Sequence, residues 1–87
     1  MAIIEENDQV SVFPNPSDGM VKVNAIIGLG QTARFELSNN LGQLVFSQQL
    51  SSGYLHQLNL GNLQQGLYFY RLIQNGTQTA HGKIILH

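Results

Sequence analysis

The sequence has 87 residues, of which 43% are hydrophobic and 10% are charged, and it carries a formal net charge of −1. This length fits one small folded domain, and so many apolar residues beside so few charges exclude a disordered tail. The 4 cations never cluster, which excludes the basic stripe of a nucleic-acid binder, and no apolar run is long enough to span a bilayer. With no cysteine in the chain, disulfides, thiol nucleophiles and thiolate zinc sites are excluded as well.

The first half of the chain predicts four short strands separated by turns. Residues 10–13 are β-prone and stop at Pro14-Asn15-Pro16, because proline fixes φ and lacks the N–H that a strand donates. Gly19 then allows a tight turn before residues 20–26, in which apolar and polar side chains alternate as in a half-buried strand. The next two predicted strands cover residues 33–38 and 43–50.

The second half of the chain predicts three more strands. Residues 57–60 alternate, and Leu63 is expected to fill the core just beyond them. Residues 67–73 are apolar on both faces, which predicts either a central strand or a partly exposed one. Asn75-Gly76 is a strong hairpin signal, because a type I′ turn needs φ > 0 at both positions, and it leads into the seventh strand over residues 77–86.

No segment keeps the apolar spacing of a helix over three turns, so we predict an all-β fold. Seven short strands with tight loops favour an immunoglobulin-like antiparallel sandwich of two sheets over a closed barrel. Residues 1–9 are acidic and show no strand pattern, and we expect a linker there. The predicted core consists of Val21, Val23, Phe35, Leu37, Leu58, Leu60, Tyr68 and Leu72.

Three motifs follow one another along residues 10–87. Residues 12–19 hold Pro-Asn-Pro-x-x-Gly, residues 40–45 read Asn-Leu-Gly-Gln-Leu-Val, and residues 63–68 read Leu-Gln-Gln-Gly-Leu-Tyr. The last motif is followed by an apolar strand and by Lys83-Ile84-Ile85-Leu86 close to the end. In this order and spacing the motifs resemble the C-terminal sorting domain of proteins exported by the type IX (Por) secretion system of Bacteroidetes. The chain departs slightly from the usual basic ending of that family, because it has one lysine, Lys83, and a terminal His87.

The resemblance implies that residues 10–87 form a sorting domain behind an upstream cargo domain, with residues 1–9 as the linker. In that family the cargo crosses the periplasm, meets an outer-membrane translocon and a sortase-like protease, and reaches the cell surface or the medium. The export signal of the family concentrates in the segment that matches Lys83, Ile84, Ile85 and Leu86, which we expect in an accessible edge strand. The remaining motif residues are expected mainly to determine the fold: Pro14, Asn15, Pro16, Gly19, Gly42, Gly66 and Tyr68.

Catalytic and metal-binding interpretations find little support in the sequence. No nucleophile motif such as G-x-S-x-G occurs, and the carboxylates lie mostly in the expected linker and turns. His56, His81 and His87 are too scattered for the three or four convergent ligands of a zinc site. We therefore expect no enzymatic activity, no catalytic residue, no metal and no cofactor.

The main alternative is a carbohydrate-binding or adhesive β-sandwich module. Such a module needs two or three coplanar aromatic rings on an exposed face. The candidate rings are Tyr54, Tyr68 and Tyr70, and the last two are expected in the core. A protein partner is therefore the better prediction, because low charge suits docking without long-range steering.

Overall fold

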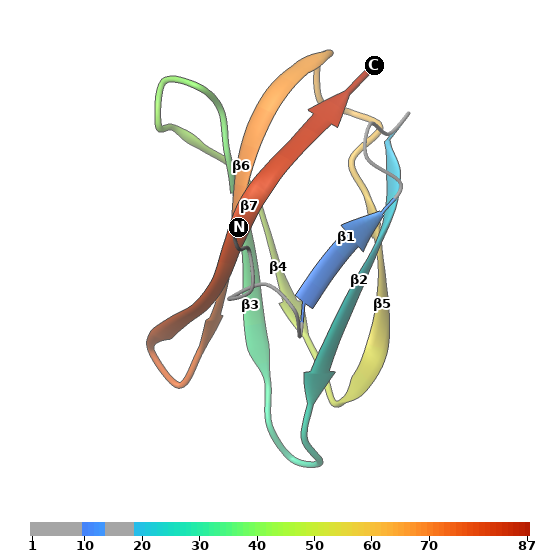
Figure 1. Cartoon of the computed structure of the whole chain (residues 1–87), viewed down its shortest axis with the longest axis vertical. Helices are drawn as coiled ribbons and strands as arrows, with labels where there is room; N and C mark the ends of the chain where they lie inside the picture. The colour runs from blue at the N-terminus through green and yellow to red at the C-terminus, as the bar shows by residue number, and fades with distance from the viewer. Residues whose placement is uncertain (1–9, 14–18) are drawn as a thin grey trace, which may run out of the picture.

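A computed structural model describes residues 10–13 and 19–87, and this part of the chain contains seven strands and no helix (Figure 1). The strands match the number and the all-β class predicted from the sequence. Pro14, Asn15 and Pro16 lie outside the described residues. The strands are β1 (Val10–Phe13), β2 (Met20–Ile27), β3 (Ala33–Ser38), β4 (Leu44–Leu50), β5 (Gly53–Asn59), β6 (Gly66–Gln74) and β7 (Thr77–Leu86).

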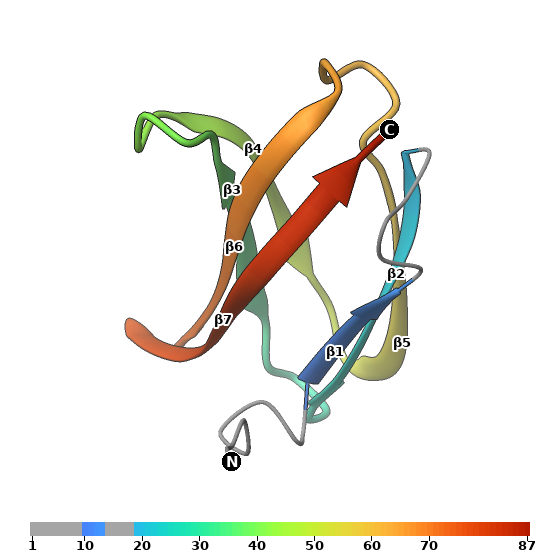
Figure 2. The same ribbon diagram turned by 45° about the horizontal axis from the view of Figure 1, so that its top comes forward.

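The strands form two antiparallel sheets that face each other as two layers (Figures 1 and 2). One sheet has the order β1-β2-β5 and the other the order β4-β3-β6-β7. In immunoglobulin-like terms β1, β2 and β5 correspond to strands A, B and E, and the larger sheet corresponds to C′-C-F-G. The predicted antiparallel sandwich is confirmed, with β6 inside the larger sheet and β7 at its edge.

The core lies between the sheets and contains all eight residues predicted for it. Alternation in β2 shows how the sequence builds this layer, because every second side chain from Val21 to Ile27 is buried and every intervening one is exposed. Complete burial of a large apolar side chain contributes about 1.5–3 kcal/mol, which makes this core the main source of stability. Leu63 packs against the core as predicted. Tyr70 is buried as expected, but the predicted core omitted several other buried residues, among them Ile27, Leu50, Ile84 and Leu86.

The fifth strand is where the sequence-based boundaries were wrong. It begins at Gly53 rather than at residue 57, so Ser51 and Ser52 alone connect β4 to β5 in the opposite sheet. The early part of β5 shows no alternation because Gly53, Tyr54 and Leu55 are all exposed on an edge strand. An edge strand without a buried face gives no period-2 signal to read.

The β6–β7 hairpin confirms the prediction made from Asn75-Gly76. Gln74 pairs with Thr77, and the two turn residues have φ of 53° and 76°, the positive values that a type I′ turn requires. This turn sets the pairing at the start of the hairpin, and a register shift between Leu72 and Ile73 then displaces the rest of β7 by one residue along β6.

Candidate functional site

The C-terminal strand β7 presents the segment 83–86 with its side chains alternating between two environments. Ile84 and Leu86 are buried in the core, whereas Lys83 and Ile85 are exposed on the outer face of the larger sheet. The strand lies at the sheet edge beside β6, as predicted. The segment therefore combines two core anchors with two outward-facing side chains.

The strand register brings the third motif and the C-terminal segment together. Gly66 pairs with Leu86, and Tyr68 pairs with Ile84. Residues separated by sixteen or more positions in sequence thus form one ladder, in which buried Tyr68 lies opposite buried Ile84 and exposed Leu67 lies opposite exposed Ile85. Any change that shifts β6 also shifts the outward-facing residues of β7.

Tyr68 fixes the corner at which the chain enters β6. Its ring is buried, and its hydroxyl donates a hydrogen bond to the carbonyl oxygen of Gln64 at 2.6 Å. A tyrosine near the start of strand F that bonds back to the preceding backbone is the tyrosine corner of immunoglobulin-like sandwiches. The Leu-Gln-Gln-Gly-Leu-Tyr motif therefore encodes a corner of the fold.

Gly19 lies where two connections of the smaller sheet approach each other closely. A Cβ atom at this position would lie 2.8 Å from the Cα of Gly61, and φ is +126°. The carbonyl of Gly19 also accepts a hydrogen bond from the N–H of Leu60 at 2.6 Å. Both the space and the backbone angle require glycine here, so the glycine of the first motif has a structural role.

The second motif forms the turn between β3 and β4 around the side chain of Asn39. Its Oδ1 accepts hydrogen bonds from the N–H groups of Leu41 and Gln43 at 2.9 and 3.0 Å, and the Gly42 N–H donates to the Asn39 carbonyl at 3.0 Å. Asparagine commonly closes turns by such side-chain bonds to the following backbone. Gly42 has φ of +83° with open space around it, so its backbone angle alone accounts for the glycine.

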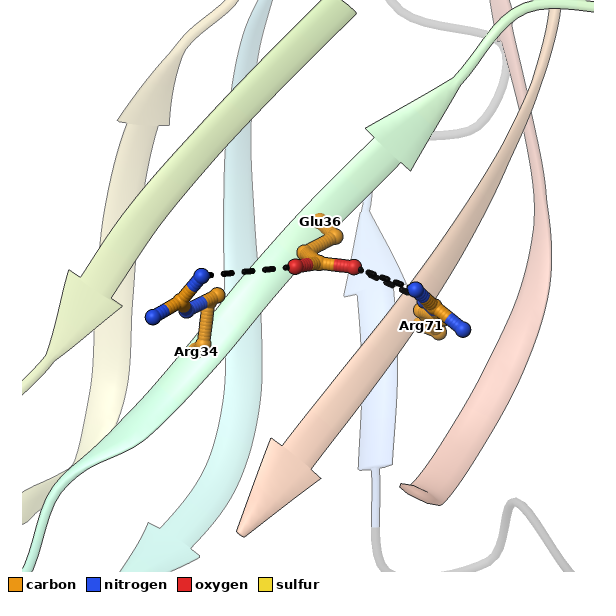
Figure 3. Close-up of polar contacts among 3 residues, drawn as sticks. All are labelled: Arg34, Glu36 and Arg71. Carbon is orange, nitrogen blue, oxygen red and sulfur yellow. Dashed lines mark hydrogen bonds and ion pairs between the residues drawn. The ribbon is translucent and has the colours of Figure 1, made fainter. Parts of the chain in front are cut away.

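A charged cluster lies on the outer face of the larger sheet (Figure 3). The carboxylate of Glu36 accepts a hydrogen bond from Nε of Arg71 at 2.8 Å. It also forms ion pairs with an Nη atom of Arg71 at 2.8 Å and with an Nη atom of Arg34 at 3.7 Å. The alternation of apolar and polar residues over 33–38 predicts that Glu36 faces solvent, but only 9% of its side chain is exposed. The neighbouring arginines cover this side chain, and the charge-assisted bonds stabilise its buried carboxylate.

Aromatic rings pack between the sheets, on the opposite face of the larger sheet from this cluster. Tyr70 stacks on Phe35 with ring centroids 5.6 Å apart, and Phe35 meets Phe46 edge to face at 6.4 Å. Burial raises the pKa of the Tyr70 hydroxyl above its ordinary value of 10.0. Because Tyr68 and Tyr70 are both buried while Tyr54 is exposed, these three tyrosines form no exposed aromatic platform.

The histidines lie apart and take separate local roles. His56 Nε2 lies 3.1 Å from the carbonyl oxygen of Ala25, where the pairing of β2 with β5 shifts register, and His81 Nδ1 lies 3.4 Å from the amide nitrogen of Gln78. His87 is exposed at the end of the chain. Among the described residues, no group of three or more His, Cys, Asp or Glu side chains is placed to hold a metal ion.

Comparison with known proteins identifies the family. Residues 11–87 match the family model of the secretion system C-terminal sorting domain. The chain belongs to this family. No curated protein matches the sequence.

The sorting domain is thus a C-terminal signal for type IX secretion, which directs a protein toward the cell surface or the medium. It operates together with the type IX secretion machinery, and its family is not known as enzymatic. Within residues 10–13 and 19–87 of the sorting domain, no helix has the length and apolar character to cross a membrane.

The structure of the sorting domain brings some of the predicted motif residues together and leaves others apart. Gly66, Tyr68 and the segment 83–86 meet along β6 and β7, whereas Gly19 and Gly42 occupy separate turns. The cluster around Glu36 was missed, because Arg71 lies 35 positions away from it and only the strand register brings them together. The sequence offered one indication of this cluster, because Glu36 and Arg34 lie on the same predicted strand.

Proposed function

We propose that the secretion machinery reads this sorting domain as a folded unit and that the segment Lys83, Ile84, Ile85 and Leu86 carries the export signal. The observation behind this proposal is the alternation in β7, where buried Ile84 and Leu86 hold the strand while Lys83 and Ile85 face outward at the sheet edge. Edge strands are common sites of recognition in proteins. The signal then depends on the fold, because unfolding removes the register that displays it.

The proposal includes a route and specific partners. Residues 10–87 form the sorting unit, and residues 1–9 link it to an upstream cargo domain. The cargo passes through the periplasm, the outer-membrane translocon recognises the domain, and a sortase-like component processes it. The domain contributes no catalysis. Gly19, Gly42, Gly66 and Tyr68 act by determining the fold, and we assign the same role to Pro14, Asn15 and Pro16.

A reporter fusion tests this function directly. A fluorescent protein with an inner-membrane export signal is joined to residues 8–87 and produced in a Bacteroidetes host. We expect fluorescence outside the cell, and we expect it to remain in the periplasm when residues 83–87 are deleted. Because that deletion also removes the two core anchors, Lys83→Ala serves as the second variant, since a surface substitution changes stability by only about 0.5 kcal/mol.

The control is a native cargo of the same host. If the host exports this cargo while the intact fusion stays in the periplasm, the sorting function is wrong for this chain. If the intact fusion and the fusion that lacks residues 83–87 are exported equally well, the export signal lies elsewhere in the domain.

A further inference from the structure

The outer face of the larger sheet carries a contiguous apolar group next to the C-terminal segment. Leu67 and Phe69 are each 40% exposed and Ile85 is 47% exposed. Leu67 pairs directly with Ile85 across the β6–β7 ladder, and Phe69, the next outward residue of β6, pairs with Lys83. Directly opposite side chains on one sheet face lie about 4.5–5.5 Å apart at Cβ, so these residues form one patch.

The outer face of the smaller sheet is arranged differently. It also exposes large apolar residues, but those at paired positions face polar partners: Phe13 pairs with Lys22, Leu55 with Asn24 and Met20 with Asn59. Ile26 and Tyr54 are exposed as well, and they lie at the register shift between β2 and β5, outside the paired positions. Among the paired positions of the two faces in the described part of the chain, only those of the larger sheet set exposed apolar residues opposite each other. Contiguous exposed apolar patches mark interaction sites, whereas scattered ones do not.

The two outer faces also differ in charge, and the larger sheet carries more cations. Arg34, Arg71 and Lys83 lie on the outer face of the larger sheet, where Glu36 is the acidic residue. Lys22 is the corresponding cation of the smaller sheet among the described residues. Three cations against one carboxylate give the larger face an excess of positive charge. More than half of each arginine side chain is exposed there, 63% for Arg34 and 54% for Arg71.

We propose that this face, which we call the docking face and define by Arg34, Leu67, Phe69, Arg71, Lys83 and Ile85, binds a protein of the secretion machinery. The partner presents apolar side chains to Leu67, Phe69 and Ile85, and a carboxylate beside them to the cations. This inference rests on the proposed sorting function and specifies the chemistry of its partner. It extends recognition from the end of β7 to a surface shared by three strands.

A protein fits this face better than an anionic membrane does. Lipid surfaces select clusters of about four to eight Lys or Arg residues, whereas here three cations are spread over three strands and one acidic residue offsets part of their charge. The docking face spans three strands, which are about 4.8 Å apart and six to ten residues long, and it covers roughly 300–450 Å². That area suits a transient interface, since stable ones bury about 800 Å² per partner.

The test compares matched substitutions on the two faces in the fluorescent fusion. Phe69 and Phe13 are of the same type and are 40% and 41% exposed, so Phe69→Ser and Phe13→Ser change equal surfaces on opposite sheets. We expect Phe69→Ser to lower export by about tenfold, on the order of losing one apolar hot-spot residue, and Phe13→Ser to leave it unchanged. Charge reversal at Lys83→Glu should likewise lower export, whereas Lys22→Glu should not.

Stability and competition measurements keep the result interpretable. Each domain is first checked by thermal unfolding, and Leu67→Ser, also at a 40% exposed residue, replaces Phe69→Ser if that variant unfolds. The free domain is then produced in the periplasm of cells that export the fusion. The wild-type and Phe13→Ser domains should compete and lower export of the fusion, and the Phe69→Ser domain should not. A folded Phe69→Ser domain that competes as well as wild type overturns the docking face.

Two further outcomes separate this inference from the function on which it rests. If the intact fusion is exported and its folded Phe69→Ser form is exported equally well, the docking face is wrong and the sorting function stands. If the intact fusion is not exported by a host with a working translocon, the sorting function itself fails. Co-sedimentation with phosphatidylcholine–phosphatidylglycerol vesicles that is lost in Phe69→Ser would assign the face to lipid and overturn the protein partner.

Discussion

The ring of Tyr70 lies directly over the main chain of Gly82, its cross-strand partner in β7. A Cβ atom at Gly82 would come within 2.6 Å of Tyr70 Cε2 and 2.7 Å of its hydroxyl oxygen. The ring cannot move aside easily, because its other face stacks on Phe35 and it is buried in the core. The close packing of β7 against the core therefore depends on the absence of a side chain at Gly82.

We predict that Gly82→Ala destabilises the domain by about 1–3 kcal/mol, the typical effect of overpacking a well-filled core. The measurement is denaturant unfolding of the purified domain. Gly28→Ala is the matched control, since its new Cβ would meet only the side-chain amide of Gln31 at 3.4 Å or more. Equal stability of the two variants would show that the Tyr70 ring can shift to accommodate the new Cβ atom at little energetic cost.

The pKa of Tyr70 predicts how the domain responds to alkali. Burial raises this pKa in the folded state above 10.0, so the unfolded chain releases the proton first as the pH rises. The contribution to stability is complete below pH 10 and is lost as the pH rises from there through the folded pKa. We expect the free energy of unfolding to fall more steeply above pH 10 in wild type than in Tyr70→Phe. Parallel pH profiles of the two proteins would contradict this.

Tyr68 gives a test of the corner that precedes β6. Tyr68→Phe removes the donor to the Gln64 carbonyl while keeping the buried ring, so we expect a loss of about 0.5–1.5 kcal/mol, the net value of one hydrogen bond. Tyr54→Phe serves as the control because Tyr54 is 69% exposed. The measurement is the melting temperature of each variant, which we expect to be lower for Tyr68→Phe than for Tyr54→Phe. Equal melting temperatures would show that the hydrogen bond from Tyr68 contributes little to stability.

The geometry of the Glu36 cluster predicts that the stability of the domain depends strongly on Arg71 and weakly on Arg34. Arg71→Ala leaves a largely buried carboxylate without its 2.8 Å bonds, which should destabilise the domain by about 1–3 kcal/mol or more. Arg34 contributes only a longer ion pair at 3.7 Å from a side chain that is 63% exposed, so Arg34→Ala should cost less than about 1 kcal/mol. Adding Glu36→Gln to Arg71→Ala should recover part of the loss. Equal losses for the two arginines, measured by unfolding, would contradict the assigned geometry.

The number of strands, the β6–β7 turn and about half of the core could be predicted because they depend on local signals. Alternation in β2 and the Asn75-Gly76 pair are read over a few residues. The start of β5, the burial of Glu36 and the contact of Tyr70 with Gly82 depend on which strands become neighbours, and sequence periodicity does not contain that information. For the same reason the sequence could suggest the segment 83–86 but not the patch that Leu67 and Phe69 form beside it.

The last prediction separates the fold from the signal that it displays. Leu58 is completely buried in β5, whereas Leu55 on the same strand is 51% exposed. Leu58→Ala should lose about 2–5 kcal/mol, comparable to the roughly 3–5 kcal/mol that stabilise so small a domain, and Leu55→Ala should lose little. In the reporter fusion we therefore expect Leu58→Ala to abolish export and Leu55→Ala to preserve it. Lys83→Ala should lower export with an unchanged melting temperature, because it alters the displayed surface and leaves the core intact. If Leu58→Ala unfolds the domain and export continues, the machinery reads a linear sequence, and recognition of the folded sandwich is wrong.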